Sequence, residues 1–284
     1  MRVPIIRRFL IVPFVMLLLG IGPAYAEEKP EWRSWPMGER VGVNVGSFFA
    51  NLDTKVRLDG TGGVLGTSFD FEQDLGLDDT KTRIMAEGYW RFFKRHRLEV
   101  SYFNLDRSGD GSSTIQIRFG DEVFQASLPL QVFLDIEIFN LGYSYSILFD
   151  EKKELALGLA LSFQDIAMGL QGTQVLSGIE VSESTSVLAP LPTFTGRFSY
   201  AITPKWSVHT NIGYFTLEVD SGGVELSGDV IAVSAGVDWQ FLKDFNLGLL
   251  YQYFRVDVNT KGEARQLTID YKYKGPVLYV GWSF

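Results

Sequence analysis

The side chains most suited to catalysis are the two histidines of the chain, His96 and His209. His209 stands two residues after Ser207, so both share one face if this segment is a strand, as a nucleophile and a base would. Such a pair is common by chance on a strand, and by itself it predicts no catalytic site. Because the chain has no cysteine, thiol catalysis and disulfide bonds are excluded. We expect no enzymatic activity, no bound metal and no cofactor.

A larger group of charged side chains lies on the polar side of several predicted strands. Arg91 and Glu99 flank the short turn at 93–96 and should lie nearly opposite, where they could pair across the strands. Two interpretations are open, a packed polar interior and a charged constriction that selects a solute, and we favour the first. The predicted cluster comprises Arg83, Glu87, Arg91, Arg97, Glu99, Arg107, Arg197 and Asp238.

The hydrophobic pattern predicts the strands that would position these residues. In LALGLALSF, residues 155–163, large apolar residues alternate with Ala, Gly and Ser, and period two over this length is typical of a strand. FNLGYSYSI, residues 139–147, repeats the pattern. Ten strands are predicted, with eight as the alternative count, near residues 41–57, 81–92, 97–107, 132–148, 155–166, 191–202, 206–218, 229–241, 247–257 and 265–284.

The connections between these strands are of two kinds, and they predict an up-and-down meander. Short turns at 93–96, 150–153, 203–205 and 243–245 alternate with long connections rich in Gly, Ser, Asp and Glu. Segment 112–127 is interpreted as a small hairpin inside one long connection. The long connections are predicted near residues 58–80, 108–131, 167–190, 219–229 and 257–265.

The side-chain pattern favours a membrane barrel over a soluble sandwich. The polar side carries Gly, Ala, Ser and Asn more often than Lys or Glu, and the central apolar side of strands four to nine carries no charge. A lipid-facing Arg or Lys at mid-membrane costs about 2–4 kcal/mol, and a closed barrel leaves no unpaired backbone edge. The expected fold class is all-β, an up-and-down antiparallel transmembrane β-barrel of about ten strands.

The tryptophans gather at one end of the predicted meander. Three lie beside short turns and a fourth lies two residues before the C-terminus, while Trp32 and Trp35 precede the first strand. An even number of antiparallel strands places both termini at the short-turn end, so we predict an aromatic belt at one membrane interface. The alternative is a set of scattered core aromatics. The predicted belt is Trp90, Trp206, Trp239 and Trp282.

Residues 1–26 have the features of a secretory signal peptide. They combine a basic start, the apolar run FLIVPFVMLLLG and the small-x-small site Ala24-Tyr25-Ala26. The alternative is an N-terminal membrane anchor, which the shortness of the run and Pro13 disfavour. Loss of the three arginines in this segment takes the net charge from −8 to −11. So acidic a chain is not expected to bind nucleic acid.

The chain ends in GPVLYVGWSF, in which Leu278, Val280, Trp282 and Phe284 share one parity. Together with the signal peptide, the meander and the two kinds of connection, this ending resembles the bacterial outer-membrane β-barrel proteins over essentially all of 27–284. Pieces such as FDFEQDLGLDDT, APLPTF, ITPKWS and YKGPVLYVGWSF are similar to a subgroup described only as outer-membrane β-barrel proteins. The resemblance implies a C-terminal assembly signal formed by Tyr279, Trp282 and Phe284.

The last strand is predicted to close the barrel by pairing with the first, around 41–49. Its apolar parity changes at Gly275-Pro276, and a β-bulge there would restore an outward apolar face above that point. The residues that this bulge would turn outward are Leu267, Ile269, Tyr271 and Tyr273.

The resemblance also implies a location and partners. It places a periplasmic N-terminal segment at 27–40 and the barrel at 41–284, in the bacterial cell outer membrane. The partners implied are outer-membrane lipid, lipopolysaccharide and the barrel-assembly machinery, for a monomer. In enzymes of this family that rely on histidine, that residue lies near the external end, whereas His96 and His209 should lie near the periplasmic end.

The sequence leaves three functions to compare. The first is a structural or binding surface protein with a largely filled polar lumen. The second is a narrow passive channel for small solutes, and the third and least favoured is an envelope protease or lipid-modifying enzyme. The long connections carry acidic residues whose spacing does not match an EF-hand loop, so we favour solvated surface loops over a calcium or lipopolysaccharide-bridging site. These residues are Glu72, Asp74, Asp78, Asp79, Asp106, Asp110, Asp121 and Glu122.

Overall fold

The computed structural model describes residue 31 and residues 37–112, 116–124, 129–173, 180–221, 224–261 and 266–284. The predicted signal peptide lies outside the described residues, and so do Trp32 and Trp35. The chain divides into two units, Met1–Glu31 and Trp32–Phe284, and the strands of the described residues all belong to the second. No helix in the described residues has the length and apolar character needed to cross a membrane.

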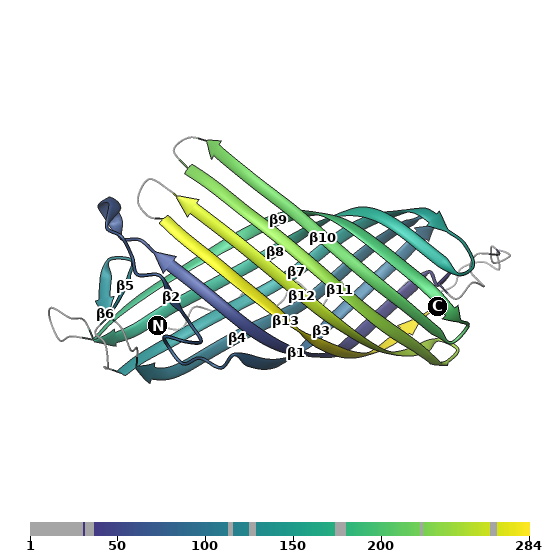
Figure 1. The fold of residues 1–284 in the computed structure, drawn as a ribbon, viewed down its shortest axis with the longest axis horizontal. Coiled ribbons are helices and arrows are strands. Elements are labelled where there is room, and N and C mark those ends of the chain that lie inside the picture. Colours follow the sequence, from purple (N-terminus) through teal and green to yellow (C-terminus); the bar gives the residue numbers. More distant parts are fainter. Residues whose placement is uncertain are drawn as a thin grey trace. The chain divides into compact units, whose positions relative to one another are not determined.

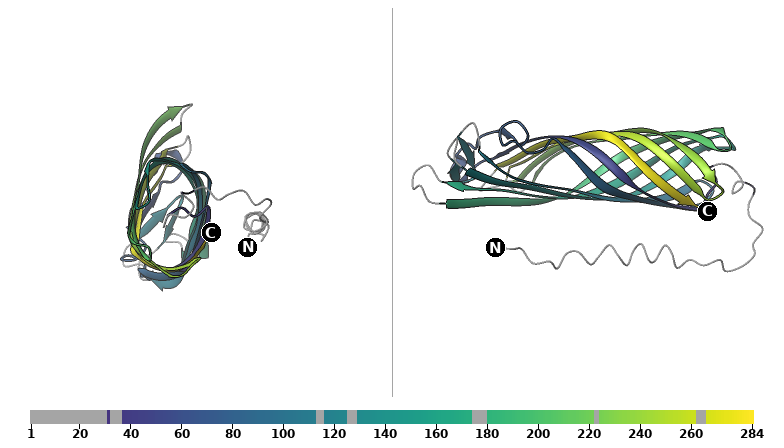
Figure 2. Two further views of the ribbon diagram at one scale, coloured as in Figure 1. Left: turned by 90° about the vertical axis from the view of Figure 1, so that its right-hand side faces the viewer. Right: turned by 90° about the horizontal axis from the view of Figure 1, so that it is seen from below.

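Ten long antiparallel strands of the described chain form one closed barrel (Figures 1 and 2). This confirms the predicted fold class and the count of ten. The short strands β5 (Ile117–Phe119) and β6 (Glu122–Phe124) form the predicted hairpin, and β2 (Phe69–Asp70) pairs with β1. The barrel strands are β1 (Val41–Leu58), β3 (Thr80–Phe93), β4 (His96–Ser112), β7 (Pro129–Phe149), β8 (Lys153–Thr173), β9 (Glu180–Thr203), β10 (Trp206–Ser221), β11 (Val224–Leu242), β12 (Phe245–Lys261) and β13 (Gln266–Ser283).

The four predicted short turns are confirmed, and they define a short-turn end of the barrel opposite a long-loop end. At the long-loop end the strands run further than predicted. The connection expected at 167–190 is mostly strand, because β8 continues to Thr173 and pairs there with Glu180 of β9. In the same way, β10 and β11 pair up to Ser221 and Val224. The backbone ladder continues beyond the apolar stretch, so hydrophobic alternation marks only part of each strand.

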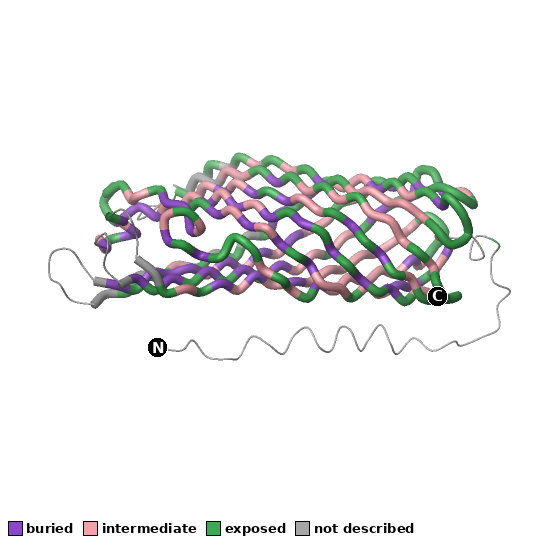
Figure 3. Tube along the Cα trace, turned by 60° about the horizontal axis from the view of Figure 1, so that its bottom comes forward, coloured by how far each residue is buried: buried purple, intermediate pink, exposed green. Residues whose placement is uncertain are grey.

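The outer surface of the barrel is apolar near the short turns and polar beyond. Leu157 is 54 % exposed, whereas its neighbour Ala156 is buried, and this alternation runs along the strands (Figure 3). Further along β7, the outward positions are occupied by Asp135 and Glu137. The apolar side chains therefore form a band around the barrel, with charged side chains on the long-loop side of it.

The described tryptophans lie at the short-turn border of this band. Trp206 and Trp239 are cross-strand partners whose rings stack with centroids 5.9 Å apart. Trp282 packs against Phe284 at 4.8 Å, and Trp90 packs against Phe92 at 5.6 Å. These four side chains thus occupy the place predicted for the aromatic belt.

The seam between β1 and β13 ties down the C-terminus. Their pairing runs in one register from Gly42 with Ser283 to Leu58 with Leu267, with a break at Phe49 and Ala50, which lie opposite Pro276 and Gly275. The carbonyl oxygen of Phe284 accepts hydrogen bonds from the backbone amides of Arg40 at 2.7 Å and Val41 at 3.0 Å. Trp282 and Phe284 lie on the outer face, whereas Tyr279 is buried inside the barrel.

The bulge predicted at Gly275-Pro276 is absent from the described strand. The register between β12 and β13 is continuous through Gly275, and the odd-numbered residues of β13 face inward along its whole length. The apolar residues above Pro276 therefore point into the barrel, because its long-loop half has an apolar interior. The residues corrected in this way are Leu267, Ile269, Tyr271 and Tyr273, all buried.

Gly275 allows the seam to pass this point. Its φ of 152° is one that residues with a Cβ rarely adopt, and a Cβ would collide with the carbonyl oxygen of Phe49. We expect Gly275→Ala to lower the thermal midpoint of the barrel by roughly 5 °C, from backbone strain and this clash. Gly88→Ala is the control, because its Cβ would make an ordinary 3.4 Å contact with Val100. Equal midpoints for the two variants, measured by circular dichroism, would contradict this role.

Candidate functional site in the barrel lumen

The interior of the barrel consists of three layers along its axis. A polar pocket lies at the short-turn end, a layer of aromatic rings lies above it, and an apolar cap fills the long-loop end. We name the rings Phe48, Phe103, Phe254, Tyr271 and Tyr273 the aromatic layer. The cap is formed by the connections 59–79, which includes the short strand β2, and 116–124, which forms the β5–β6 hairpin.

The aromatic layer joins opposite walls of the barrel. Tyr273 lies 5.6 Å from Phe48, 5.4 Å from Phe103 and 4.8 Å from Phe254, measured between ring centroids. The Tyr271 hydroxyl donates a hydrogen bond to Gln164 on β8, which stands across the barrel from β13. Rings from β1, β4, β12 and β13 therefore meet inside the lumen instead of lining an open bore.

The cap closes the lumen above this layer with apolar side chains. Phe69 packs against Phe71 at 5.3 Å and against Phe119 at 5.9 Å, and all three are 0–2 % exposed. The backbone amide of Gly120 donates to the Leu58 carbonyl at 3.0 Å, which attaches the hairpin to β1. The lumen was predicted to be polar, and in this half that prediction is wrong, because the inward side chains of the strands meet an apolar cap.

Two members of the predicted charge cluster, Arg83 and Arg107, lie in this half of the barrel. Arg107 forms an ion pair with Glu72 of the cap and donates to the Thr54 hydroxyl at 2.6 Å. Glu72 also accepts from the Thr54 backbone amide at 2.8 Å, so the cap is bound to the wall. Arg83 donates to the backbone carbonyl of Asp106. Neither arginine joins the other members of the cluster.

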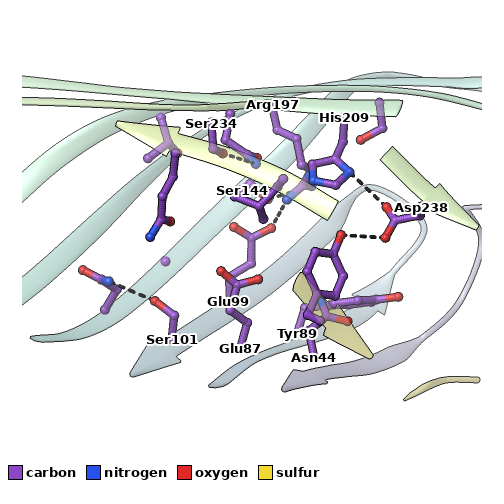
Figure 4. A pocket seen from close by; sticks show the side chains of 18 of the residues that line it. Asn44, Glu87, Tyr89, Glu99, Ser101, Ser144, Arg197, His209, Ser234 and Asp238 are labelled. Carbon is purple, nitrogen blue, oxygen red and sulfur yellow. Dashed lines mark hydrogen bonds and ion pairs between the residues drawn. The ribbon is translucent and has the colours of Figure 1, made fainter. Parts of the chain in front are cut away.

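The remaining arginines form a network in the pocket, which we call the arginine network. Arg91 and Glu154 are 1–2 % exposed and pair at 2.9 Å, while Arg197 lies 3.3 Å from the same carboxylate. Glu99 pairs with Arg97 at 2.9 Å. It also pairs with Arg197 (Figure 4). Each carboxylate of the network therefore serves two arginines, and Arg197 links both carboxylates.

The pairing predicted between Arg91 and Glu99 does not occur. The register places Arg91 opposite Arg97 and places Tyr89 opposite Glu99, with an irregularity beside the turn. Arg91 pairs instead with Glu154 on β8, which is not a member of the predicted cluster. Glu154 lies directly after a short turn and has the same parity along β8 as the inward-facing Ala156. Its inward orientation could therefore have been predicted from the alternation of the strand.

A second polar cluster surrounds Asp238 on the facing wall. The Asp238 carboxylate lies 3.0 Å from His209 Nδ1 (Figure 4). It also accepts hydrogen bonds from the Tyr279 hydroxyl at 2.6 Å and from Asn246 at 2.9 Å. Glu87 also lines this pocket. Ser207, the candidate nucleophile, lines it too, but His209 is engaged with Asp238. His96 lies on the outer surface, with Nδ1 2.8 Å from the Tyr143 hydroxyl.

The pocket itself is a cavity of about 440 Å³. Its lining runs from the turn residues Thr203 and Lys205 at the short-turn end to Phe103 and Phe254 of the aromatic layer. Met37 and Glu39, which precede β1, lie at its mouth. Burial there raises the pKa of the Glu39 carboxyl to about 7. Among the described residues, no group of three or more His, Cys, Asp or Glu side chains is arranged to hold a metal ion.

Comparison with known proteins identifies the fold and nothing finer. No protein-family model and no curated protein matches the chain. The outer-membrane protease OmpT of Escherichia coli matches at 10 % identity and a TM-score of 0.53, over 86 % of this chain and 97 % of the protease. The transport unit of the Escherichia coli autotransporter AIDA-I matches at 9 % identity and 0.40, over 96 % and 97 %. The Pseudomonas putida toluene transporter TodX matches at 10 % and 0.35, over 86 % and 90 %. The first match shows the fold of an outer-membrane β-barrel, and the lower scores of the others add no argument.

The arginine network yields a prediction about stability. Arg91→Ala and Glu154→Ala should each cost about 3–5 kcal/mol, because each leaves a buried charge without its partner. The double variant should lose clearly less than the sum of the two, as expected for residues in direct contact. The exposed pair Arg255 and Asp270, 2.9 Å apart, is the control, and its single variants should each cost about 1 kcal/mol or less. Additive losses at Arg91 and Glu154 in denaturant titrations would contradict the pairing.

Glu39 yields a prediction about pH. Between its ordinary pKa of 4.5 and its raised pKa of about 7, the folded protein binds more protons at Glu39 than the unfolded chain does. Stability from this group is therefore present at low pH and is lost as the pH rises through that window. Glu39→Gln should make the thermal midpoint less dependent on pH between about pH 5 and about pH 8. Glu151→Gln, at an exposed turn position, is the control. An unchanged pH dependence in Glu39→Gln would refute the shift.

Proposed function

We propose that the protein is a bacterial outer-membrane β-barrel with a structural or binding role, whose lumen is closed to the passage of solutes. The short-turn end faces the periplasm and the capped long-loop end faces the cell exterior. Lipid and lipopolysaccharide contact its outer surface, and the barrel-assembly machinery recognises the last strand, with Trp282 and Phe284 at its end. It works as a monomer, without a cofactor.

The outer surface supports the proposed location. The exposed apolar band would face the hydrocarbon core, and the Trp206–Trp239 stack and Trp282 would lie at its border. Asp135 and Glu137 lie beyond the band, where charged side chains remain in water or among lipid headgroups. Each of the ten strands pairs with a neighbour on both sides, so the barrel has no open sheet edge within the lipid.

The single observation that carries the closed lumen is the aromatic layer beneath the cap. A permeating ion or polar solute needs water or polar groups along its whole path. Here Phe48 and Tyr271 are 0–1 % exposed, and above them Leu134 and Ile136 are equally buried against the cap. Removing the hydration shell of a solute in such an environment costs several kcal/mol. This favours a surface or binding protein over the passive channel.

We propose no enzymatic role. Both histidines lie toward the short-turn end, which this orientation places in the periplasm, and His209 is held by Asp238 inside a pocket closed above. Neither histidine is near the cap, where the barrel would meet substrates at the cell surface.

Planar-bilayer recording tests the closed lumen. The purified wild-type protein should give no discrete single-channel steps, under conditions in which a general porin conducts. A variant in which a short Gly-Ser linker replaces 60–78 should also stay closed, because the aromatic layer remains. Adding Phe254→Ala and Tyr273→Ala to that variant should open a conducting path. Discrete steps from the wild-type protein would overturn the proposal.

A further inference from the structure

We propose that the lumen pocket is a binding site for a small, neutral, polyhydroxylated molecule, of the size of a disaccharide, that enters from the short-turn end. This goes beyond the closed-lumen function, which requires no ligand. The pocket lies below the aromatic layer, so whatever binds there comes and leaves by the same opening.

The dimensions of the pocket suit a small ligand. Its volume of about 440 Å³ lies within the range of small-molecule sites, about 300–1,000 Å³. Phe103 and Phe254 form part of its ceiling, and the walls come from strands on all sides of the barrel. A concave site with an apolar end and convergent polar walls can bury most of a ligand surface.

The polar groups of the upper wall are mainly neutral hydroxyls and amides. Asn140 donates to the Ser101 hydroxyl at 2.9 Å, and Asn211 donates to the Ser234 hydroxyl at 3.2 Å. Each of these pairs is oriented by its own hydrogen bond and keeps further donor and acceptor capacity. Wall residues of this type are Ser101, Asn140, Ser162, Thr193, Asn211, Ser234 and Gln252.

Gln252 gives the most specific indication of a ligand. The Nε atoms of Arg97 and Arg197 in the pocket also lack a hydrogen-bond partner, but those side chains form ion pairs, whereas Gln252 is neutral and forms none. Its Nε2 atom is buried and has no hydrogen-bond partner among the described residues, yet the side chain lines the pocket. A buried amide donor without a partner costs free energy, so native proteins keep such groups mainly where something else satisfies them. A ligand hydroxyl in the pocket would accept this hydrogen bond.

The charges of the pocket favour a neutral ligand. Arg97 and Arg197 are already paired with Glu99 and Glu154, and Asp238 is engaged by His209 and Tyr279. An anion would have to compete with these carboxylates for the arginines. A cation would have to compete with the arginines for Glu99 and Glu154, and with His209 for Asp238. Hydroxyl groups can instead add to paired carboxylate and guanidinium groups without separating them.

Isothermal titration calorimetry on the purified mature protein tests this inference. The protein is kept in a detergent without sugar headgroups, since a glycosidic detergent would compete. The probes are sucrose and trehalose as free saccharides and the N-acetylglucosamine disaccharide as the end of a glycan polymer. Putrescine and inorganic phosphate are the charged probes. We expect saturable binding of at least one saccharide and none of the charged probes. The saccharide that binds then distinguishes a free solute from a polymer end.

Two glutamine variants separate binding from folding. Gln252→Leu has nearly the same shape and removes the unpartnered donor, so it should weaken saccharide binding at least about ten-fold, as for one lost hydrogen bond. Its thermal midpoint should hold or rise. Gln171→Leu makes the same change at an exposed position of β8 outside the pocket, and it should leave both the midpoint and the affinity unchanged.

Three results would overturn the proposal. The first is the absence of saturable heat for every saccharide, and the second is binding of putrescine or phosphate alone. The third is full saccharide affinity in Gln252→Leu.

Discussion

The structure depends on the backbone ladder that joins the last strand to the first. β13 pairs with β1 from Ser283 to Leu267, and the terminal Phe284 carbonyl accepts two further hydrogen bonds. Without this seam, two strand edges would carry unpaired amides and carbonyls across the apolar band, where lipid offers no partner. At Gly275 the two strands approach so closely that a Cβ would collide with the carbonyl oxygen of Phe49.

Closure of the ladder creates an interior that must be filled. In the long-loop half, the inward side chains are apolar and pack against the cap and the aromatic layer. In the short-turn half, arginines and carboxylates neutralise each other, as in the pair of Arg91 with Glu154 at 2.9 Å. Because these charges are buried, each is stabilised only as long as its partner remains. The boundary between the halves is formed by Phe48 and the rings that contact it, and the pocket lies directly below.

Much of this architecture could be predicted from the sequence, and the failures share one cause. Alternation such as LALGLALSF shows a strand that separates lipid from a polar interior, so the ten strands and four short turns were predictable. Tyr271 and Tyr273 were assigned to the lipid because an apolar residue was assumed to face it, whereas these face an apolar lumen. The partner of Arg91 depends on the register at one turn and on the opposite strand β8, which no local pattern contains. Neither the aromatic layer nor the pocket leaves a local signal, since both combine residues distant in the chain.

In the proposed orientation, the aromatic layer separates the pocket from the cell exterior. Because the chain has no cysteine, single cysteines can report this in intact cells with a membrane-impermeant maleimide. Leu65→Cys, at a cap position that is 69 % exposed, should react from outside. Asn211→Cys, in the pocket, should react only after the outer membrane has been permeabilised to admit the reagent to the periplasm. Labelling of Asn211→Cys in intact cells at the rate of Leu65→Cys would contradict the account.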